Sequence, residues 1–144
     1  MSGQLMFELV APEGLKFSGR TFEVILPTPE GQIAVLPHHI PLVSIVSPGV
    51  ISIRHHQEDP DERLEHLACA GGVVEISGKR VRVLTDSAER AEDINELRSQ
   101  EALIQAQALR HAATDQVSLA DATRLIELNL ARLKVAQLKR RRRP

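Results

Sequence analysis

The stretch RVRVLTDSAERAEDINELRSQEAL, residues 80–103, contains the change of pattern that decides the fold. Its first part alternates apolar Val81 and Val83 with arginines, and this period of two is typical of a half-buried β-strand. From residue 89 to residue 143 the chain has no glycine or proline and is rich in residues that favour helix. The sequence therefore predicts a β part up to residue 88 and a helical part after it.

The residues before this stretch repeat the strand pattern between frequent turns. Apolar and polar residues alternate at 21–26, 33–35 and 51–54, and β-branched residues dominate. All 8 glycines precede residue 79, and 7 of the 8 prolines precede residue 61. Many short strands between turns indicate a sandwich or a barrel. We expect residues 1–88 to form a small all-β sandwich of two sheets.

Residues 89–144 are expected to form an α-helical hairpin, so that the chain is of the segregated α+β type. Two antiparallel helices of about 20 residues each would be joined by a turn at residues 111–117. Ser118, followed by Asp121 three residues later, resembles a capping box at the start of the second helix. One apolar face of the first helix would carry Ile94, Leu97, Ile104 and Ala108.

The second helix carries apolar residues on more than one side. A first stripe comprises Leu119, Ala122, Ile126, Leu130 and Leu133. A second stripe comprises Leu125, Leu128, Val135 and Leu138. One partner helix cannot cover both stripes. We therefore expect contact with the sandwich, with another subunit, or with each in turn.

The net charge of −1 conceals an asymmetry between the body and the C-terminal end. Residues 139–143 are all basic, and the other 13 basic and 19 acidic residues give the body a charge of −6. Such a run is either a solvated helix end, which complements the helix dipole, or a contact with something acidic. No signal peptide and no apolar run long enough to span a membrane is seen. We expect a soluble protein that faces the cytoplasm.

The sequence lacks the motifs of the enzymatic and metal sites that we considered. The adjacent pairs His38-His39 and His55-His56 would point to opposite faces of a strand, so neither pair predicts a metal site. Cys69, the only cysteine, lies in an apolar run and is expected to be a buried small hydrophobe. Nucleophile-elbow and phosphate-loop spacings are absent. We expect no catalytic residue and no metal.

Several segments together are similar to the epsilon subunits of bacterial and chloroplast F-type ATP synthases, called delta in mitochondria. The most specific segment is EGQIAVLPHHIPL at residues 30–42, with its Pro-x-His-x-Pro-Leu pattern. The others are residues 48–53, 70–76, 81–88 and 131–136. The resemblance covers nearly the whole chain. It implies a non-catalytic rotor subunit of the central stalk, on the cytoplasmic face of the bacterial inner membrane.

The resemblance also implies two contacts of the sandwich with other subunits. Glu30, Gly31 and Gln32 would rest on the ring of c subunits, whereas their pattern alone predicts an ordinary exposed turn. The gamma subunit would contact Pro37, His39, Pro41 and Leu42. The two prolines restrict the backbone on either side of His39.

For the hairpin, the resemblance implies inhibition of ATP hydrolysis. Bacterial relatives can extend this hairpin into the catalytic head, where it would meet the alpha and beta subunits. The residues of this chain that would make the contact are Arg132, Lys139, Arg140, Arg141 and Arg142. A hairpin with two alternative packings suffices for such a switch.

Some members of the family bind ATP on the folded hairpin, and this suggests an alternative function as a nucleotide sensor. The corresponding residues here are Ile94, Arg98 and Arg132. Asn95 and Ser99 depart from the family motif, because Asn95 replaces a carboxylate that could accept hydrogen bonds. We therefore expect no resident cofactor and at most weak ATP binding. A nucleic-acid-binding role for the arginine tail is a third alternative, which the acidic body and an aromatic content of 2% disfavour.

Overall fold

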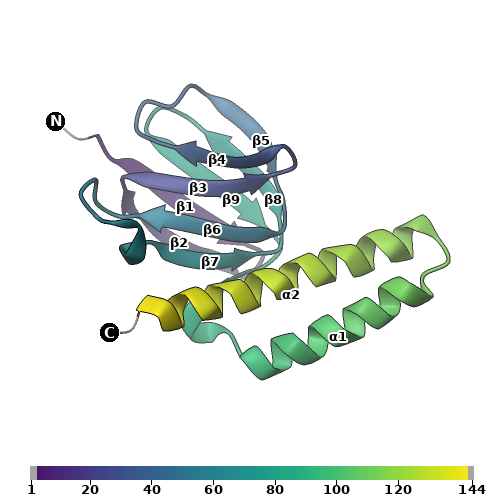
Figure 1. Ribbon diagram of the computed structural model, residues 1–144. Coiled ribbons are helices and arrows are strands. Elements are labelled where there is room, and N and C mark those ends of the chain that lie inside the picture. The colour runs from purple at the N-terminus through teal and green to yellow at the C-terminus, as the bar shows by residue number, and fades with distance from the viewer. Residues whose placement is uncertain (1–2, 143–144) are drawn as a thin grey trace.

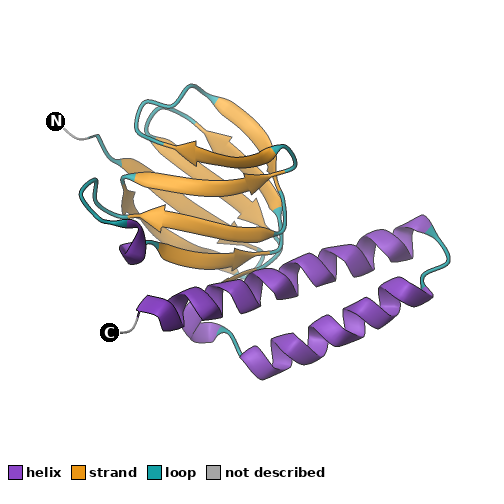
Figure 2. Ribbon diagram, in the orientation of Figure 1, coloured by secondary structure: helices purple, strands orange, loops and turns teal. Residues whose placement is uncertain are grey.

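The chain folds as a β-sandwich with a helical hairpin packed against one of its two sheets (Figures 1 and 2). The computed structural model describes residues 3–142, and for Arg142 the backbone alone. The predicted fold class, an N-terminal sandwich followed by a C-terminal helical hairpin, is confirmed. The last strand of the sandwich is Ala88–Arg90, and the first long helix begins at Glu96.

Each of the two sheets that the structure describes has five strands. In order across sheet A they are β2 (Gly14–Thr21), β1 (Leu5–Ala11), β9 (Arg80–Thr85), β8 (Gly72–Ile76) and β5 (Leu42–Val46). In sheet B they are β10 (Ala88–Arg90), β7 (Glu65–Cys69), β6 (Gly49–Arg54), β3 (Glu23–Thr28) and β4 (Gly31–Val35). β1 and β9 pair in parallel, and the other described pairs are antiparallel.

The core lies between the two sheets and is built by the alternation that the sequence shows. It contains Phe7 and Phe17, whose ring centroids lie 5.4 Å apart, and otherwise consists largely of aliphatic residues. Cys69 is fully buried in this core, as predicted, and burial raises the pKa of its thiol. A short 3₁₀ turn, η1 (Asp61–Arg63), lies between β6 and β7.

Strand β7 is buried on both faces, and this joins the sandwich to the hairpin. Leu67 and Cys69 point into the core, whereas Ala68 between them packs against the long C-terminal helix. Helix α2 (Gln116–Arg142) contacts β7 and β6. The hairpin therefore packs against the β7 and β6 part of sheet B, and no described helix lies on the outer face of sheet A (Figure 1).

The chain does not enter a helix directly after residue 88. It first forms β10, which pairs with β7, and then the 3₁₀ turn η2 (Ala91–Asp93). Helix α1 (Glu96–Ala112) has 17 residues and α2 has 27. The expectation of two helices of about 20 residues was therefore wrong for α2, because nothing in its sequence breaks a helix before its end.

The start of α2 also differs from the prediction. The Asp115 side chain accepts a hydrogen bond of 2.8 Å from the amide of Ser118, so Asp115 caps the helix and the predicted Ser118 cap was wrong. Hydrogen bonds from the amide and the hydroxyl of Ser118 hold the pKa of the Asp115 carboxyl below its usual value. Helix α1 is capped in the same way by Asn95, which accepts from the amide of Arg98 at 3.0 Å.

The two helices meet through small residues and leave larger ones outside. Ser99 and Ala106 are the buried residues of α1, whereas Leu97 and Ile104 remain 67% and 66% exposed. The apolar face marked by Leu97, Ile104 and Ala108 is therefore not the seam with α2. Small side chains at the seam allow the two backbones to approach each other closely. Leu97, Ile104 and Leu109 remain exposed outside the seam, whereas Leu103 is half-buried.

Candidate functional site

Helix α2 rests on the sandwich along its second apolar stripe. Val135 and Ala131 pack against Ala68 of β7, with Val50 and Ile94 at the edge of the cluster. Val135 is fully buried, and Leu128 of the same stripe is nearly so. Of the alternative partners expected for the apolar sides of the second helix, the sandwich is the one that the folded chain shows, through Val135 of this stripe.

Three ion pairs join the C-terminal half of α2 to the segment that leads into the hairpin. Arg132 Nη2 lies 2.6 Å from Glu89 Oε1, and Lys139 Nζ lies 3.9 Å from Glu92 Oε2. Arg140 Nη1 lies 2.5 Å from both carboxylate oxygens of Glu96. These cations belong to the predicted inhibitory set, and in the folded chain they are paired with its own carboxylates.

Two further residues of the predicted inhibitory set lie at the end of α2. Arg141 is exposed. The side chain of Arg142 lies outside the described part of the structure. The ion pairs given above therefore involve only some of the basic residues at the end of α2.

A cavity of about 280 Å³ opens between β10, η2 and the two helices. Its lining residues are Glu89, Asp93, Asn95, Arg98, Ser99, Ala102 and Arg132. The structure thus brings together Arg98 and Arg132, two of the three predicted nucleotide residues, while Ile94 lies instead in the apolar cluster under α2. The Arg132 guanidinium already contacts Glu89, and Asn95 uses its side-chain oxygen as a helix cap.

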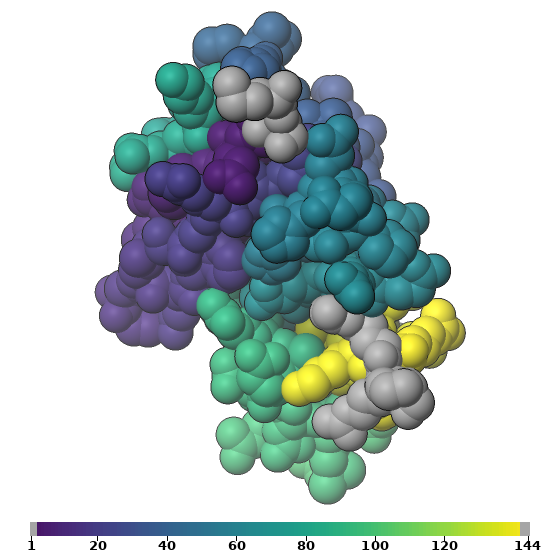
Figure 3. Space-filling view, turned by 90° about the vertical axis from the view of Figure 1, so that its left-hand side faces the viewer, coloured from purple at the N-terminus to yellow at the C-terminus, as the bar shows by residue number. Residues whose placement is uncertain are grey.

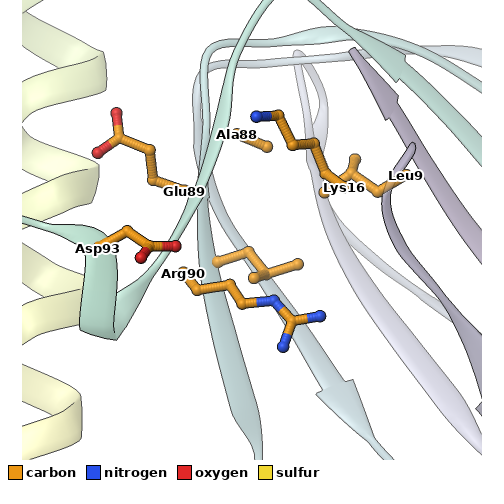
Figure 4. A pocket seen from close by; sticks show the side chains of 7 residues that line it. Leu9, Lys16, Ala88, Glu89, Arg90 and Asp93 are labelled. Carbon is orange, nitrogen blue, oxygen red and sulfur yellow. The ribbon is translucent and has the colours of Figure 1, made fainter. Parts of the chain in front are cut away.

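A second cavity of about 280 Å³ lies on the sandwich side of β10 (Figure 4). Leu9 and Leu67 line it together with Lys16 and Arg90. Figure 4 shows that Glu89 points toward the helices, whereas its neighbour Arg90 points toward the sandwich. The Arg90 guanidinium lies 5.3 Å from the centroid of the Phe17 ring. Glu89, which pairs with Arg132, lines this cavity as well as the first one, so the two cavities lie on either side of β10.

The predicted ring-contact residues form the exposed turn between β3 and β4. Gly31 has φ of 120°, a backbone conformation that favours glycine, and the Thr28 hydroxyl donates to the Gly31 carbonyl at 2.6 Å. Glu30, Gly31 and Gln32 are all exposed. This turn lies at the opposite end of β4 from the loop that leads to β5 (Figure 1).

The predicted gamma-contact residues lie in the loop between β4 and β5 and at the start of β5. The amide of His39 donates to the Leu36 carbonyl at 3.1 Å, with Pro37 and His38 at the two central positions of the turn. His38 has φ of 69°, and its amide donates to the Gly78 carbonyl at 2.9 Å, which ties the loop to the turn between β8 and β9. Pro41 and Leu42 are exposed, while Pro37 and His39 are half-buried.

An apolar row, which sequence reasoning missed, crosses the outer face of all five strands of sheet A. Successive members are register partners on neighbouring strands, so their side chains lie side by side. The row consists of Ile45, Val73, Leu84, Val10 and Leu15. Ile45 is 62% exposed and Leu15 is 58% exposed. We call these five residues the sheet A row.

A polar border lies beside the sheet A row. The next register row contains Glu8 and Arg82, and Arg82 Nη2 and Arg80 Nε each lie 3.3 Å from a carboxylate oxygen of Glu8. The sequence did contain one signal of the row. Val73 and Leu84, two of its members, are each next in sequence to a buried valine, Val74 and Val83 respectively. Consecutive apolar residues in a strand indicate that both faces are apolar.

Among the side chains that the structure describes, no three His, Cys, Asp or Glu residues gather as they would around a metal ion. None of the described helices is both long enough and apolar enough to cross a membrane.

The family model that describes the beta-sandwich domain of the ATP synthase delta/epsilon chain matches residues 4–91 of this sequence. The chain belongs to this delta/epsilon family. The ATP synthase epsilon chain of Chromobacterium violaceum is 37% identical over 141 residues, which cover 96% of this chain and 97% of that one. The epsilon chain of Acidithiobacillus ferridurans is also 37% identical, over 90% of this chain and 88% of its own length. The predicted resemblance is confirmed.

A solved structure shares the fold of both the sandwich and the hairpin. A chain of the Euglena gracilis mitochondrial ATP synthase, solved as OSCP/F1/c-ring, superposes with a TM-score of 0.76 at 19% identity. The superposition covers 94% of this chain and 82% of that chain. At this identity the likeness shows the fold alone. As a member of the delta/epsilon family, the chain is an accessory subunit that is not by itself an enzyme.

Proposed function

We propose that the chain is a rotor subunit of the central stalk of a proton-translocating ATP synthase, and that its helical hairpin inhibits ATP hydrolysis. The two parts divide this work. The sandwich carries the contacts that couple rotation to ATP synthesis, and the hairpin carries the regulation. The observation that supports the coupling role most strongly is the sheet A row, which none of the described helices or strands covers.

An exposed apolar row with a charged border has the composition of a protein contact. Exposed apolar side chains are common singly, but contiguous ones mark interaction surfaces. The core of such a surface is apolar and its rim is polar. At its β5 end the row adjoins Val43 and the loop with Ile40, which are 70% and 75% exposed. The row thereby extends the gamma contact that the resemblance implies for Pro37, His39, Pro41 and Leu42.

The ring contact is proposed for the turn at Glu30, Gly31 and Gln32. The turn projects from the end of β4 opposite the gamma-contact loop (Figure 1). A strand of five residues separates the two contacts by about 17 Å. One edge of the sandwich can thus reach two neighbouring partners at once.

The hairpin has the properties of an element with two alternative packings. In the folded state it exposes apolar residues such as Leu97, Ile104 and Leu130. Its basic end is held by carboxylates that another acidic surface can replace. We propose that Arg132, Lys139, Arg140, Arg141 and Arg142 meet the alpha and beta subunits when the hairpin extends.

The proposed function is tested by adding the purified chain to an ATP synthase that lacks its epsilon-type subunit. We expect the addition to restore proton-coupled synthesis and to lower ATP hydrolysis. If coupling is restored while hydrolysis is unchanged, the regulatory half is refuted. If neither changes, the rotor assignment is refuted as well.

A second candidate function is nucleotide sensing in the cavity between β10 and the hairpin. The observation that favours it is the presence of Arg98 and Arg132 in one cavity of about 280 Å³. Against strong binding, Glu89 and Asp93 line the same cavity and repel phosphates. Calorimetry of the isolated chain with ATP should show binding that is lost in Arg98→Ala. Absence of heat at millimolar ATP refutes this candidate.

A further inference from the structure

The segment that links the sandwich to the hairpin carries a strip of three carboxylates. Glu89 lies in β10, Glu92 in η2, and Glu96 is the first residue of α1. Opposite them, Arg132, Lys139 and Arg140 lie in the C-terminal half of α2. Figure 3 shows the yellow end of α2 beside the green start of the hairpin, below the sandwich.

The three ion pairs differ in burial and so in strength. The side chains of Arg132 and Glu89 are 23% and 28% exposed, and a second hydrogen bond of 2.8 Å from Arg132 Nε fixes their geometry. Asn129 holds the guanidinium from the other side, since its Oδ1 accepts from Arg132 Nη1 at 3.1 Å. The pairs of Lys139 and Arg140 are more exposed, and such pairs are individually weak and screened by salt.

The apolar contact beneath α2 is small. Its buried members are Ala68, Ala131 and Val135, of which only Val135 has more than one side-chain carbon, and Val50, Ala91 and Ile94 pack against them while partly exposed. Because apolar stabilisation scales with the buried area, alanines contribute little to docking. Electrostatic attraction therefore carries a larger share of the docking energy here than in an ordinary core.

We propose that the three ion pairs form an electrostatic latch that holds the C-terminal half of α2 against β10, η2 and the first turn of α1, and that ionic strength controls its opening. When α2 moves away from residues 89–96, all three ion pairs break. The three carboxylates and the three cations then become exposed together. An acidic surface on another subunit would then compete directly for the same cations. A regulatory role for this opening rests on the proposed inhibitory function. The latch itself is a property of the isolated chain.

The latch is tested on the full chain with fluorescent labels at Gln57→Cys and Asp121→Cys, two exposed positions outside the latch. The native Cys69 is fully buried and should not react. Energy transfer between the labels reports whether α2 is docked. Between about 0.05 M and about 0.5 M salt, we expect the docking equilibrium constant to fall about tenfold.

Charge variants identify the groups responsible. The triple variant Glu89→Gln, Glu92→Gln, Glu96→Gln should dock about tenfold less well at low salt and lose its salt dependence. The control Glu101→Gln, an exposed carboxylate on α1 outside the latch, should behave like the parent chain. Glu96→Arg should weaken docking, and the added Arg140→Glu should restore it by exchanging the two charges.

Docking that is unchanged by salt and by the triple variant would overturn the latch. Failure of the charge exchange to restore docking would also overturn it, since a latch depends on opposite charge at this pair. These outcomes are read on the isolated chain, whereas the proposed inhibitory function is read from ATP hydrolysis by the complex. The two can therefore fail independently.

Discussion

The double variant Ile45→Glu, Leu84→Glu should fold like the parent chain but bind the gamma subunit about 100-fold more weakly. Both residues belong to the sheet A row, and both are exposed, so carboxylates there face water in the free chain. In the complex the same carboxylates would lose water without gaining a partner. Titration of labelled chain with purified gamma subunit measures the effect.

The matched control for this variant is Leu97→Glu, Ile104→Glu. It makes the same chemical change at two apolar residues of α1 that are similarly exposed. We expect its affinity for the gamma subunit to equal that of the parent chain. Equal weakening by both double variants would show a general effect of added charge, and no weakening by either would remove the sheet A row from the gamma contact.

Gly72→Ala should lower the free energy of unfolding of the sandwich by about 3 kcal/mol or more. A Cβ at this position would lie 1.9 Å from the carbonyl oxygen of Leu84 on the neighbouring strand β9. Backbone atoms cannot move aside as a flexible side chain can, so β8 and β9 would have to separate. Denaturant unfolding followed by circular dichroism measures the loss.

Gly78→Ala provides the comparison for Gly72→Ala. A Cβ at Gly78 meets no atom within 4 Å, so the free energy of unfolding should change by less than about 0.5 kcal/mol. If Gly72→Ala is equally harmless, β8 and β9 do not approach each other at this point as closely as the structure shows.

The division of the chain could be predicted because its two halves have different periods. Val81 and Val83 alternate as a strand requires, and the segment beyond residue 89 lacks glycine and proline. Local pattern does not determine pairing between distant strands, however. The parallel pair of β1 and β9 brings Val10 beside Leu84, and only this register assembles the sheet A row.

The details of the hairpin were less accessible to sequence reasoning. Leu97 and Ile104 marked an apolar face, but the seam with α2 uses Ser99 and Ala106 because small side chains allow closer packing. Asp115 took the capping role expected of Ser118, since an aspartate one turn earlier caps equally well. The latch partners of the basic end could not be predicted, because Glu96 and Arg140 meet only after the chain reverses.

The central claim, that the hairpin must leave the sandwich to inhibit ATP hydrolysis, is tested most directly by locking it in place. Pro48 and Thr123 line one hollow between the sandwich and α2, so cysteines at these positions can be joined by a short bifunctional thiol reagent. In an ATP synthase that contains Pro48→Cys, Thr123→Cys, we expect cross-linking to raise ATP hydrolysis several-fold, with no effect of the reagent on either single variant. Hydrolysis that is the same before and after complete cross-linking would contradict the account.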